Sequence, residues 1–221
     1  MKYYAVNGSP RKTKNTAILL QSVLEGIQAT HPDARTEIIH LYELDFQPCT
    51  SCFACKRLGG RSYGKCAAKD ALAPILDILA DADGVIFGSP IYFHSLSAKM
   101  RGFLERFLYQ YMAYDRDLSS LAPKKMPTAF IYTMNATERQ AQELNYPGML
   151  HDIEAVIERV FQKPRILYAF DTYQFNDYTR YMADYFSEPE KALQKQTRFP
   201  QDIEAAFKIG AVMAAGRPVK A

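Results

Sequence analysis

The sequence predicts an α/β fold built on a doubly wound parallel β-sheet. Strand-like segments rich in β-branched and aromatic residues alternate with segments whose apolar residues recur every three or four positions, as in amphipathic helices. The run Gly84–Phe87 does not alternate polar with apolar residues, which is typical of a strand buried on both faces. The 221 residues, 48% of them hydrophobic, suffice for one sizeable core. These features favour parallel strands covered by helices on both faces.

The elements follow one another in a regular order. Strands are expected at residues 3–6, 36–41, 84–87, 128–132 and 165–170, each a short run of β-branched or aromatic residues. Helices are expected between most of them, where apolar residues have helical spacing, at residues 17–29, 72–79, 98–109 and 150–161. Five strands that alternate with helices therefore predict a five-stranded sheet.

The last fifty or so residues have a different character. An aromatic and polar stretch at residues 173–181 is followed by Ser187-Glu188-Pro189-Glu190, which opens a charged helix. A final helix is expected at residues 201–214, where several apolar residues form one side. We therefore divide the chain into a domain of residues 1–172 and a C-terminal helical extension of residues 173–221. The extension is expected to pack on the domain or on a partner subunit.

The first strand leads into a polar loop that suits a phosphate group. The loop Asn7-Gly8-Ser9-Pro10-Arg11-Lys12-Thr13-Lys14-Asn15-Thr16 directly precedes the first helix. It presents backbone N–H groups and the positive end of a helix dipole, both of which favour an anion. The candidate phosphate ligands are Ser9, Arg11, Thr13, Asn15 and Thr16. The alternative interpretation is an ordinary surface turn before an amphipathic helix.

Two further loops are expected at the same edge of the sheet. Ligands of doubly wound sheets bind beyond the carboxyl ends of the strands. The loop after the third strand would offer a rigid apolar and aromatic wall to a flat ring, with Pro90, Ile91, Tyr92, Phe93 and His94. The fourth strand ends in a third loop, with Thr133, Met134 and Asn135. The alternative is that Tyr92 and Phe93 cap the core, but three converging loops favour a ligand site.

Several separated motifs occur in an order that resembles one known family. They are Asn7-Gly8-Ser9-Pro10-Arg11 with Asn15-Thr16, Ala82-Asp83-Gly84-Val85-Ile86-Phe87-Gly88-Ser89-Pro90-Ile91-Tyr92-Phe93, Lys99, and Phe103-Leu104-Glu105-Arg106. Over residues 2–135 the chain resembles the NADPH-dependent FMN reductase and iron-sulfur flavoprotein family of flavodoxin-like proteins. Glu105 departs from the pattern, because relatives usually carry Asp before the Arg.

The resemblance implies a flavodoxin-like three-layer fold with strand order 2-1-3-4-5 and FMN as the prosthetic group. It places the Ser9 to Thr16 loop on the FMN phosphate, and the loops at residues 90–94 and 133–135 around the ring. NAD(P)H is the implied electron donor. Because relatives are commonly dimers or tetramers, a homodimer or homotetramer is expected.

All four cysteines fall within one short stretch, Cys49 to Cys66. Cys49, Cys52 and Cys55 form a C-x2-C-x2-C run, and Cys66 follows after ten intervening residues. Such spacing lets three thiolates surround one side of a [4Fe–4S] cluster while a fourth arrives from a loop. We therefore take these four cysteines as candidate cluster ligands. Iron-sulfur flavoproteins usually place the fourth cysteine closer, so Leu58–Gly64 resembles an insertion.

Other interpretations of the cysteines stay open. They are free or structural thiols, a tetrathiolate zinc site and a redox disulfide. Zinc sites more often use two separated C-x2-C pairs. Nearby basic residues would offset the negative charge of a cluster, attract the 2′-phosphate of NADPH or solvate the loop: Lys56, Arg57, Arg61, Lys65 and Lys69.

Charge and composition argue against several other partners. A net charge of +3 with 23% charged residues is too mild to favour nucleic acid or a membrane surface. The first strand begins almost at Met1 and no later run is long and apolar enough to span a bilayer, so we expect a cytoplasmic protein. The first loop lacks the Gly-Lys-Ser/Thr ending of a P-loop nucleotide hydrolase.

We therefore expect an FMN-dependent oxidoreductase that accepts hydride from NAD(P)H and reduces a small acceptor such as a quinone, free flavin, or nitro- or azo-compound. Donors near the ring's N1 and C2 carbonyl matter more here than a general base, and Thr133 and Asn135 are the candidates. No catalytic acid is assigned, because a lone loop histidine such as His94 is more often solvated. The alternatives are an electron-transfer module for a protein partner and a zinc or redox-sensor protein.

Overall fold

The computed structural model describes residues 1–216, which form a three-layer α/β fold. The central sheet contains β1 (Lys2–Asn7), β2 (Arg35–His40), β3 (Gly84–Tyr92), β5 (Thr128–Thr133) and β6 (Arg165–Ala169). All neighbouring pairs of these strands are parallel, in the order β2-β1-β3-β5-β6. Counted along the chain, this is the order 2-1-3-4-5, so the predicted flavodoxin-like fold is confirmed. The short β4 (Ser95–Leu96) pairs antiparallel with β3.

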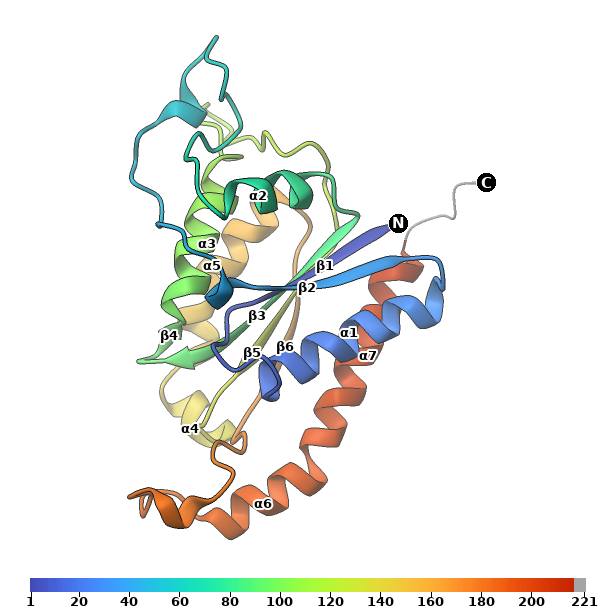
Figure 1. The fold of residues 1–221 in the computed structure, drawn as a ribbon, viewed down its shortest axis with the longest axis vertical. Helices are drawn as coiled ribbons and strands as arrows, with labels where there is room; N and C mark the ends of the chain where they lie inside the picture. The colour runs from blue at the N-terminus through green and yellow to red at the C-terminus, as the bar shows by residue number, and fades with distance from the viewer. Residues whose placement is uncertain (217–221) are drawn as a thin grey trace.

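Helices cover both faces of the sheet (Figure 1). One face carries α1 (Asn15–Thr30) and α7 (Phe199–Ala215). The other carries α2 (Ala73–Ala80), α3 (Ala98–Tyr109) and α5 (Tyr146–Val160). Each face has its own hydrophobic cluster, and strand side chains alternate between the two: Val85 and Phe87 pack with α3, and Ile86 packs with α1. The smaller elements are α4 (Glu138–Glu143), α6 (Glu188–Thr197) and the 3-10 turns Leu41–Glu43, Ala54–Lys56 and Tyr178–Arg180.

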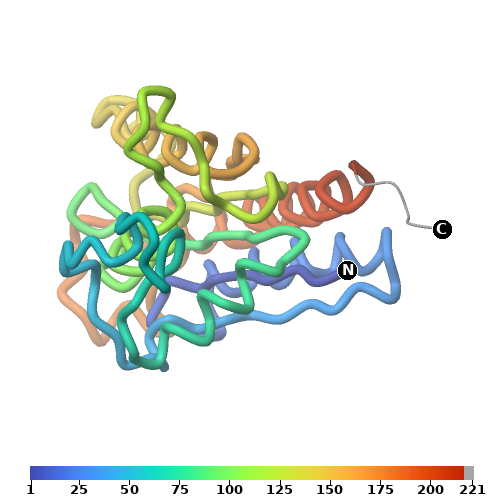
Figure 2. Tube along the Cα trace, turned by 90° about the horizontal axis from the view of Figure 1, so that it is seen from above, coloured from blue at the N-terminus to red at the C-terminus, as the bar shows by residue number. Residues whose placement is uncertain are grey.

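Two glycines bring α7 of the C-terminal extension against α1. A Cβ atom at Gly26 would lie 2.0 Å from the Phe207 carbonyl oxygen, and one at Gly210 would lie 1.9 Å from the Val23 carbonyl oxygen. The helix backbones therefore meet directly. Figure 2 shows the red C-terminal helix beside the blue first helix, so the extension completes one helical layer of the sheet. Residues 217–221 of the extension lie outside the described residues.

The third strand is longer than predicted, and this changes the character of the second ligand loop. Gly88, Ser89 and Pro90 were expected in a loop but continue β3, where Pro90 pairs with Thr133. The strand then turns back through β4, with Tyr92 opposite Ser95. Ser89 Oγ accepts a hydrogen bond from the Ser97 N–H at 3.0 Å, which fixes the returning chain. The second ligand loop is therefore a strand end followed by a tight hairpin.

Among the helices of residues 1–216, none is both long and apolar enough to cross a bilayer.

Candidate functional site

A cavity of about 110 Å³ lies at the carboxyl edge of β1, β3 and β5, where three predicted ligand loops meet. The first loop contributes Ser9, Arg11, Asn15 and Thr16 to its wall. The second and third loops contribute Pro90, Ile91, Tyr92, Thr133, Met134 and Asn135. The structure thus brings together side chains that are up to 126 positions apart in the sequence.

The first loop leaves an uncapped helix end at this cavity. Gly8 N–H donates to the Gly88 carbonyl oxygen at 2.8 Å, which ties the start of the loop to β3. The Asn7 side-chain oxygen accepts from the Ser9 N–H at 2.9 Å, and Ser9 Oγ accepts from the Arg11 N–H at 3.1 Å. The α1 N-terminus has no side-chain cap and no acidic residue in its first turn. Its first N–H groups and dipole are therefore suited to an anion.

A hydroxyl pair joins the first and third loops at the cavity. Thr16 Oγ1 and Thr133 Oγ1 lie 2.8 Å apart and are buried. The pair carries two hydroxyl protons and uses only one between its members, so one remains for a third acceptor. The threonines therefore position each other and still offer one donor to a ligand.

The third loop carries a polar atom that the fold does not satisfy. Among the described residues, the buried Oδ1 atom of Asn135 has no hydrogen-bond partner. A buried oxygen that accepts no hydrogen bond lowers the stability of the folded protein by about 1–3 kcal/mol. Such atoms are therefore rare, and a bound ligand that donates to the oxygen is one explanation for them. An N–H group of a polar ring would satisfy Asn135, and an anion would satisfy the first loop. The cavity thus fits a phosphorylated heteroaromatic molecule such as FMN.

Three predicted residues do not reach the cavity wall: Thr13, Phe93 and His94. Phe93 and His94 form the turn between β3 and β4 with φ angles of 47° and 63°, a left-handed conformation that non-glycine residues rarely adopt. This turn leaves Phe93 fully exposed. The His94 Nδ1 atom lies 2.9 Å from the Tyr146 hydroxyl, so α5 holds the ring.

The structure also adds three residues to the cavity that were not predicted. They are Lys14 in the first loop, and Thr172 and Gln174 in the segment after β6. Thr172 N–H and Oγ1–H both donate to the Met134 carbonyl oxygen, at 2.9 and 3.1 Å. This segment follows the fifth parallel strand and so begins at the carboxyl edge of the sheet. That position was the sequence signal that could have placed Thr172 and Gln174 in the site.

A second cavity, of about 60 Å³, is lined by all four cysteines. Gly59 and Gly64 adopt φ angles of 71° and 72° in the loop that returns the chain to Cys66. Cys66 N–H then donates to the Gln110 side-chain oxygen at 2.8 Å. The loop length between Cys55 and Cys66 is therefore compatible with a shared site.

Arg106 on α3 lies on the same cavity and is almost fully buried. Its Nε–H donates to the Cys66 sulfur at 3.3 Å, and it forms an ion pair with Asp70. Its Nη2 atom is buried without a hydrogen-bond partner among the described residues. The Arg106 cation therefore faces the thiols from inside the protein.

Burial raises the pKa of the Cys55 thiol, and the nearby Lys56 charge opposes this rise.

Within residues 1–216, no three cysteine, histidine or acidic side chains are arranged tightly enough to hold a metal ion. The four cysteines are free, and their exposure ranges from buried Cys55 to exposed Cys52. The cluster ligand assignment thus stays a prediction.

A family model described as NADPH-dependent FMN reductase matches residues 1–146, two thirds of the chain. The chain belongs to this family. The resemblance over residues 2–135 is confirmed. The matched region contains all three ligand loops and all four cysteines.

Curated relatives of this FMN reductase family member include two archaeal iron-sulfur flavoproteins. One, from Methanocaldococcus jannaschii, is 36% identical over 106 residues, which are 48% of this chain and 51% of the relative. Another, from Archaeoglobus fulgidus, is 33% identical over 106 residues, which are 48% of each chain. The matched region therefore spans about half the length of these relatives.

Solved structures show the same fold at low sequence identity. An NAD(P)H:quinone oxidoreductase from Methanothermobacter marburgensis has a TM-score of 0.68 at 12% identity, and the match covers 96% of this chain and 98% of the other. An azoreductase from Bacillus anthracis has a TM-score of 0.65 at 13% identity, covering 96% and 99%. This family member thus shares the fold of these two structures along nearly its whole length.

Proposed function

We propose that the protein is an FMN-dependent oxidoreductase that takes electrons from NAD(P)H and reduces a small acceptor such as a quinone, free flavin, or nitro- or azo-compound. One observation carries this proposal: an uncapped α1 N-terminus and an unsatisfied Asn135 oxygen face the same cavity at the carboxyl edge of the sheet. Family membership and the fold neighbours, a quinone oxidoreductase and an azoreductase, support it.

The residues of the chain divide between two ends of the ligand. Arg11, Lys14 and the first N–H groups of α1 would bind the phosphate, because they supply positive charge and oriented donors. Asn135 and the Thr16–Thr133 hydroxyl pair would orient the polar edge of the ring, while Pro90 and Tyr92 would wall it. When bound, FMN supplies the redox chemistry between the nicotinamide and the acceptor.

The experiment is to purify the protein, extract its flavin, and mix the FMN-loaded protein anaerobically with NADPH or NADH. We expect one FMN per chain and rapid bleaching of flavin absorbance, followed by reoxidation when a quinone or azo-compound is added. Bound flavin that does not react with either nicotinamide would instead indicate the electron-transfer module for a protein partner.

We also propose that the cysteine cavity holds a [4Fe–4S] cluster ligated by Cys49, Cys52, Cys55 and Cys66. The specific observation is that all four cysteines line one cavity together with Arg106, whose buried Nη2 atom has no hydrogen-bond partner among the described residues. Thiolate ligands give a cluster net negative charge, so a buried guanidinium beside them would be stabilising. The names of the curated relatives agree with this assignment.

Cys52→Ser tests the cluster proposal. We expect the anaerobically purified variant to lose iron and brown absorbance while it still binds FMN, because Cys52 lies outside the carboxyl-edge cavity. Ser51→Ala, next to Cys52 but not a candidate ligand, is the matched control and should retain iron. Iron that persists in Cys52→Ser would contradict the ligand assignment, and bound zinc would indicate the tetrathiolate alternative.

A homodimer or homotetramer remains part of the proposal. In such an assembly, a partner subunit would cover the fully exposed Phe93 beside the cavity. Light scattering on the eluting protein tests it, and a monomeric mass at micromolar concentration would contradict it.

A further inference from the structure

The segment after β6 reaches across the carboxyl-edge cavity to the phosphate loop. We call residues 172–176 the strap. Arg11 Nη1 donates to the Gln174 carbonyl oxygen at 2.6 Å, and Asn15 Nδ2 donates to the Tyr173 carbonyl oxygen at 3.0 Å. Lys14 Nζ donates to Asn176 Oδ1 at 2.8 Å. Three donors of the phosphate loop are thus held by one segment about 160 positions away in the sequence.

All three acceptors on the strap are uncharged. They are two backbone carbonyl oxygens and one amide oxygen, so they orient the donors without cancelling their charge. Over residues 1–216, neither Arg11 nor Lys14 has a carboxylate partner within 4.0 Å. Both cations therefore keep their charge available for an anion.

The acidic side chains around the strap are directed to other partners. Asp171 pairs with the buried Lys191, and Asp177 accepts hydrogen bonds from the N–H and hydroxyl of Thr179. Glu188 accepts from the Tyr173 hydroxyl at 2.7 Å. The acids around the strap therefore do not neutralise Arg11 or Lys14.

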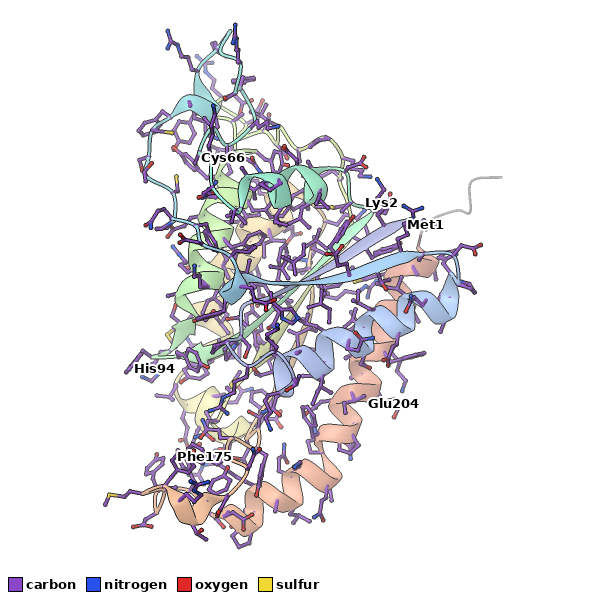
Figure 3. All side chains as sticks on the ribbon, viewed as in Figure 1. Met1, Lys2, Cys66, His94, Phe175 and Glu204 are labelled. Atoms are coloured by element: carbon purple, nitrogen blue, oxygen red, sulfur yellow. The ribbon has the colours of Figure 1, made fainter. Side chains whose placement is uncertain are left out.

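The strap is itself fixed at its first residue and at its middle. Thr172 is anchored to the Met134 carbonyl oxygen on the third loop. Gln174 N–H donates to the Tyr178 hydroxyl at 3.1 Å, and the Tyr178 ring packs edge-on against Tyr173 and Phe175. Figure 3 shows Phe175 on the side of the molecule that also carries His94, away from Cys66. A rigid strap reduces the entropy that the bound loop must lose.

The cavity remains open with the strap in place, because Thr172 and Gln174 form part of its wall. The strap therefore bounds the cavity without filling it. Arg11 uses one of its five N–H donors on the strap, which leaves others for phosphate oxygens.

We propose that the strap is a clasp that preorganises Arg11, Lys14 and Asn15 for the phosphate group of FMN. It thereby sets the preference of the protein for FMN over riboflavin. This inference rests on the proposed function, because it assigns FMN to the cavity. Tyr178, which does not line the cavity, is a positioning residue in this scheme.

The test measures the dissociation constants of FMN and riboflavin for the flavin-free protein by fluorescence titration. Their ratio isolates the contribution of the phosphate. Tyr178→Phe removes the hydroxyl that holds Gln174, and Asn176→Ala removes the acceptor for Lys14. Each variant should bind FMN more weakly and riboflavin as before. The dissociation constant of riboflavin divided by that of FMN should therefore fall about three- to tenfold, the change expected from losing one hydrogen bond. Tyr185→Phe, a highly exposed tyrosine in the same region, is the matched control and should leave the ratio unchanged.

The outcomes separate the clasp from the proposed function. If the unaltered protein binds FMN but both strap variants keep its ratio, the clasp is overturned and the proposed function stands. Equal weakening of FMN binding and riboflavin binding would also overturn the clasp, because the strap would then act on the ring and not on the phosphate. If the unaltered protein binds no FMN, both proposals fail.

Discussion

The side chains of the phosphate loop differ in how much of their bonding capacity the fold already uses. Ser9 N–H is bound by Asn7, and the Thr16 hydroxyl is shared with Thr133. Lys12 is paired with Glu43 and does not line the cavity. Arg11 keeps most of its donors and its full charge. It is therefore the single residue whose loss should affect phosphate binding most.

Arg11→Ala should weaken FMN binding about tenfold or more, because a charge-assisted hydrogen bond contributes about 1.5–3 kcal/mol. Titration of the flavin-free variant with FMN measures the change in dissociation constant. Lys12→Ala removes the same charge from the adjacent position and should have little effect. Equal weakening in both variants would show that net charge, and not the position of Arg11, governs binding.

At the scale of elements, the two helices on one face depend on glycine at their crossing. Gly210→Ala should lower the free energy of unfolding by about 1 kcal/mol. A new Cβ would lie 1.9 Å from the Val23 carbonyl oxygen, and the overpacking should cost about 2 kcal/mol, of which helix propensity returns ~1 kcal/mol. Chemical denaturation measures it.

Gly216→Ala is the control for this prediction. Its nearest neighbour would be the Val212 carbonyl oxygen at 3.7 Å, an ordinary contact, and its φ angle is not positive. An unchanged free energy of unfolding in Gly210→Ala would mean that α1 and α7 do not touch as closely as described.

A buried ion pair connects the segment before α2 to α3. Burial raises the pKa of the Asp70 carboxyl, but the hydrogen bond and charge of Arg106 outweigh it and lower the pKa below its ordinary value. A lowered folded-state pKa adds stability above the unfolded pKa of about 3.9, and this stability is lost as the pH falls through the folded pKa.

Asp70→Asn should therefore destabilise the protein at pH 7 and leave Arg106 uncompensated. We expect a loss of about 1–3 kcal/mol, below the range for fully buried pairs because Asp70 is partly exposed. The difference from the unaltered protein should shrink as the pH falls below 4. Asp77→Asn, in an exposed pair with Lys65, is the control. A pH-independent difference would contradict the pKa assignment.

Sequence patterns located the elements well where periodicity was strong. The predicted helix at residues 98–109 has the observed bounds of α3, and the final helix overlaps α7. The length of the third strand was underestimated because Gly88, Ser89 and Pro90 are typical of turns. Pairing with β5 and β4 extends this strand to Tyr92. The short α4 was not predicted, although Thr137 and Gln140 form a capping box.

The same contrast holds for the candidate site. The three loops after β1, β3 and β5 carry recognisable residue types, and most of their predicted ligands line the cavity. Thr172 and Gln174 escaped prediction because no local motif marks them. Their role depends on contacts with Met134 and Arg11 that only the folded chain creates.

At the scale of the whole molecule, the two cavities lie apart. Figure 3 shows Cys66 in the upper part of the molecule and His94, in the turn that follows the cavity residue Tyr92, much further down the long axis. Changes to the thiols should therefore leave flavin binding intact. Strand–helix alternation predicted the parallel sheet, but the strand order came from the family resemblance, because alternation alone does not fix order.

The most direct test of the central claim is a crystal structure of the protein soaked with FMN. We expect phosphate density at the α1 N-terminus, within hydrogen-bond distance of Arg11 and Asn15, and ring density bounded by Pro90, Tyr92 and Asn135. Flavin bound elsewhere, or a carboxyl-edge cavity that stays empty at saturating FMN, would contradict it.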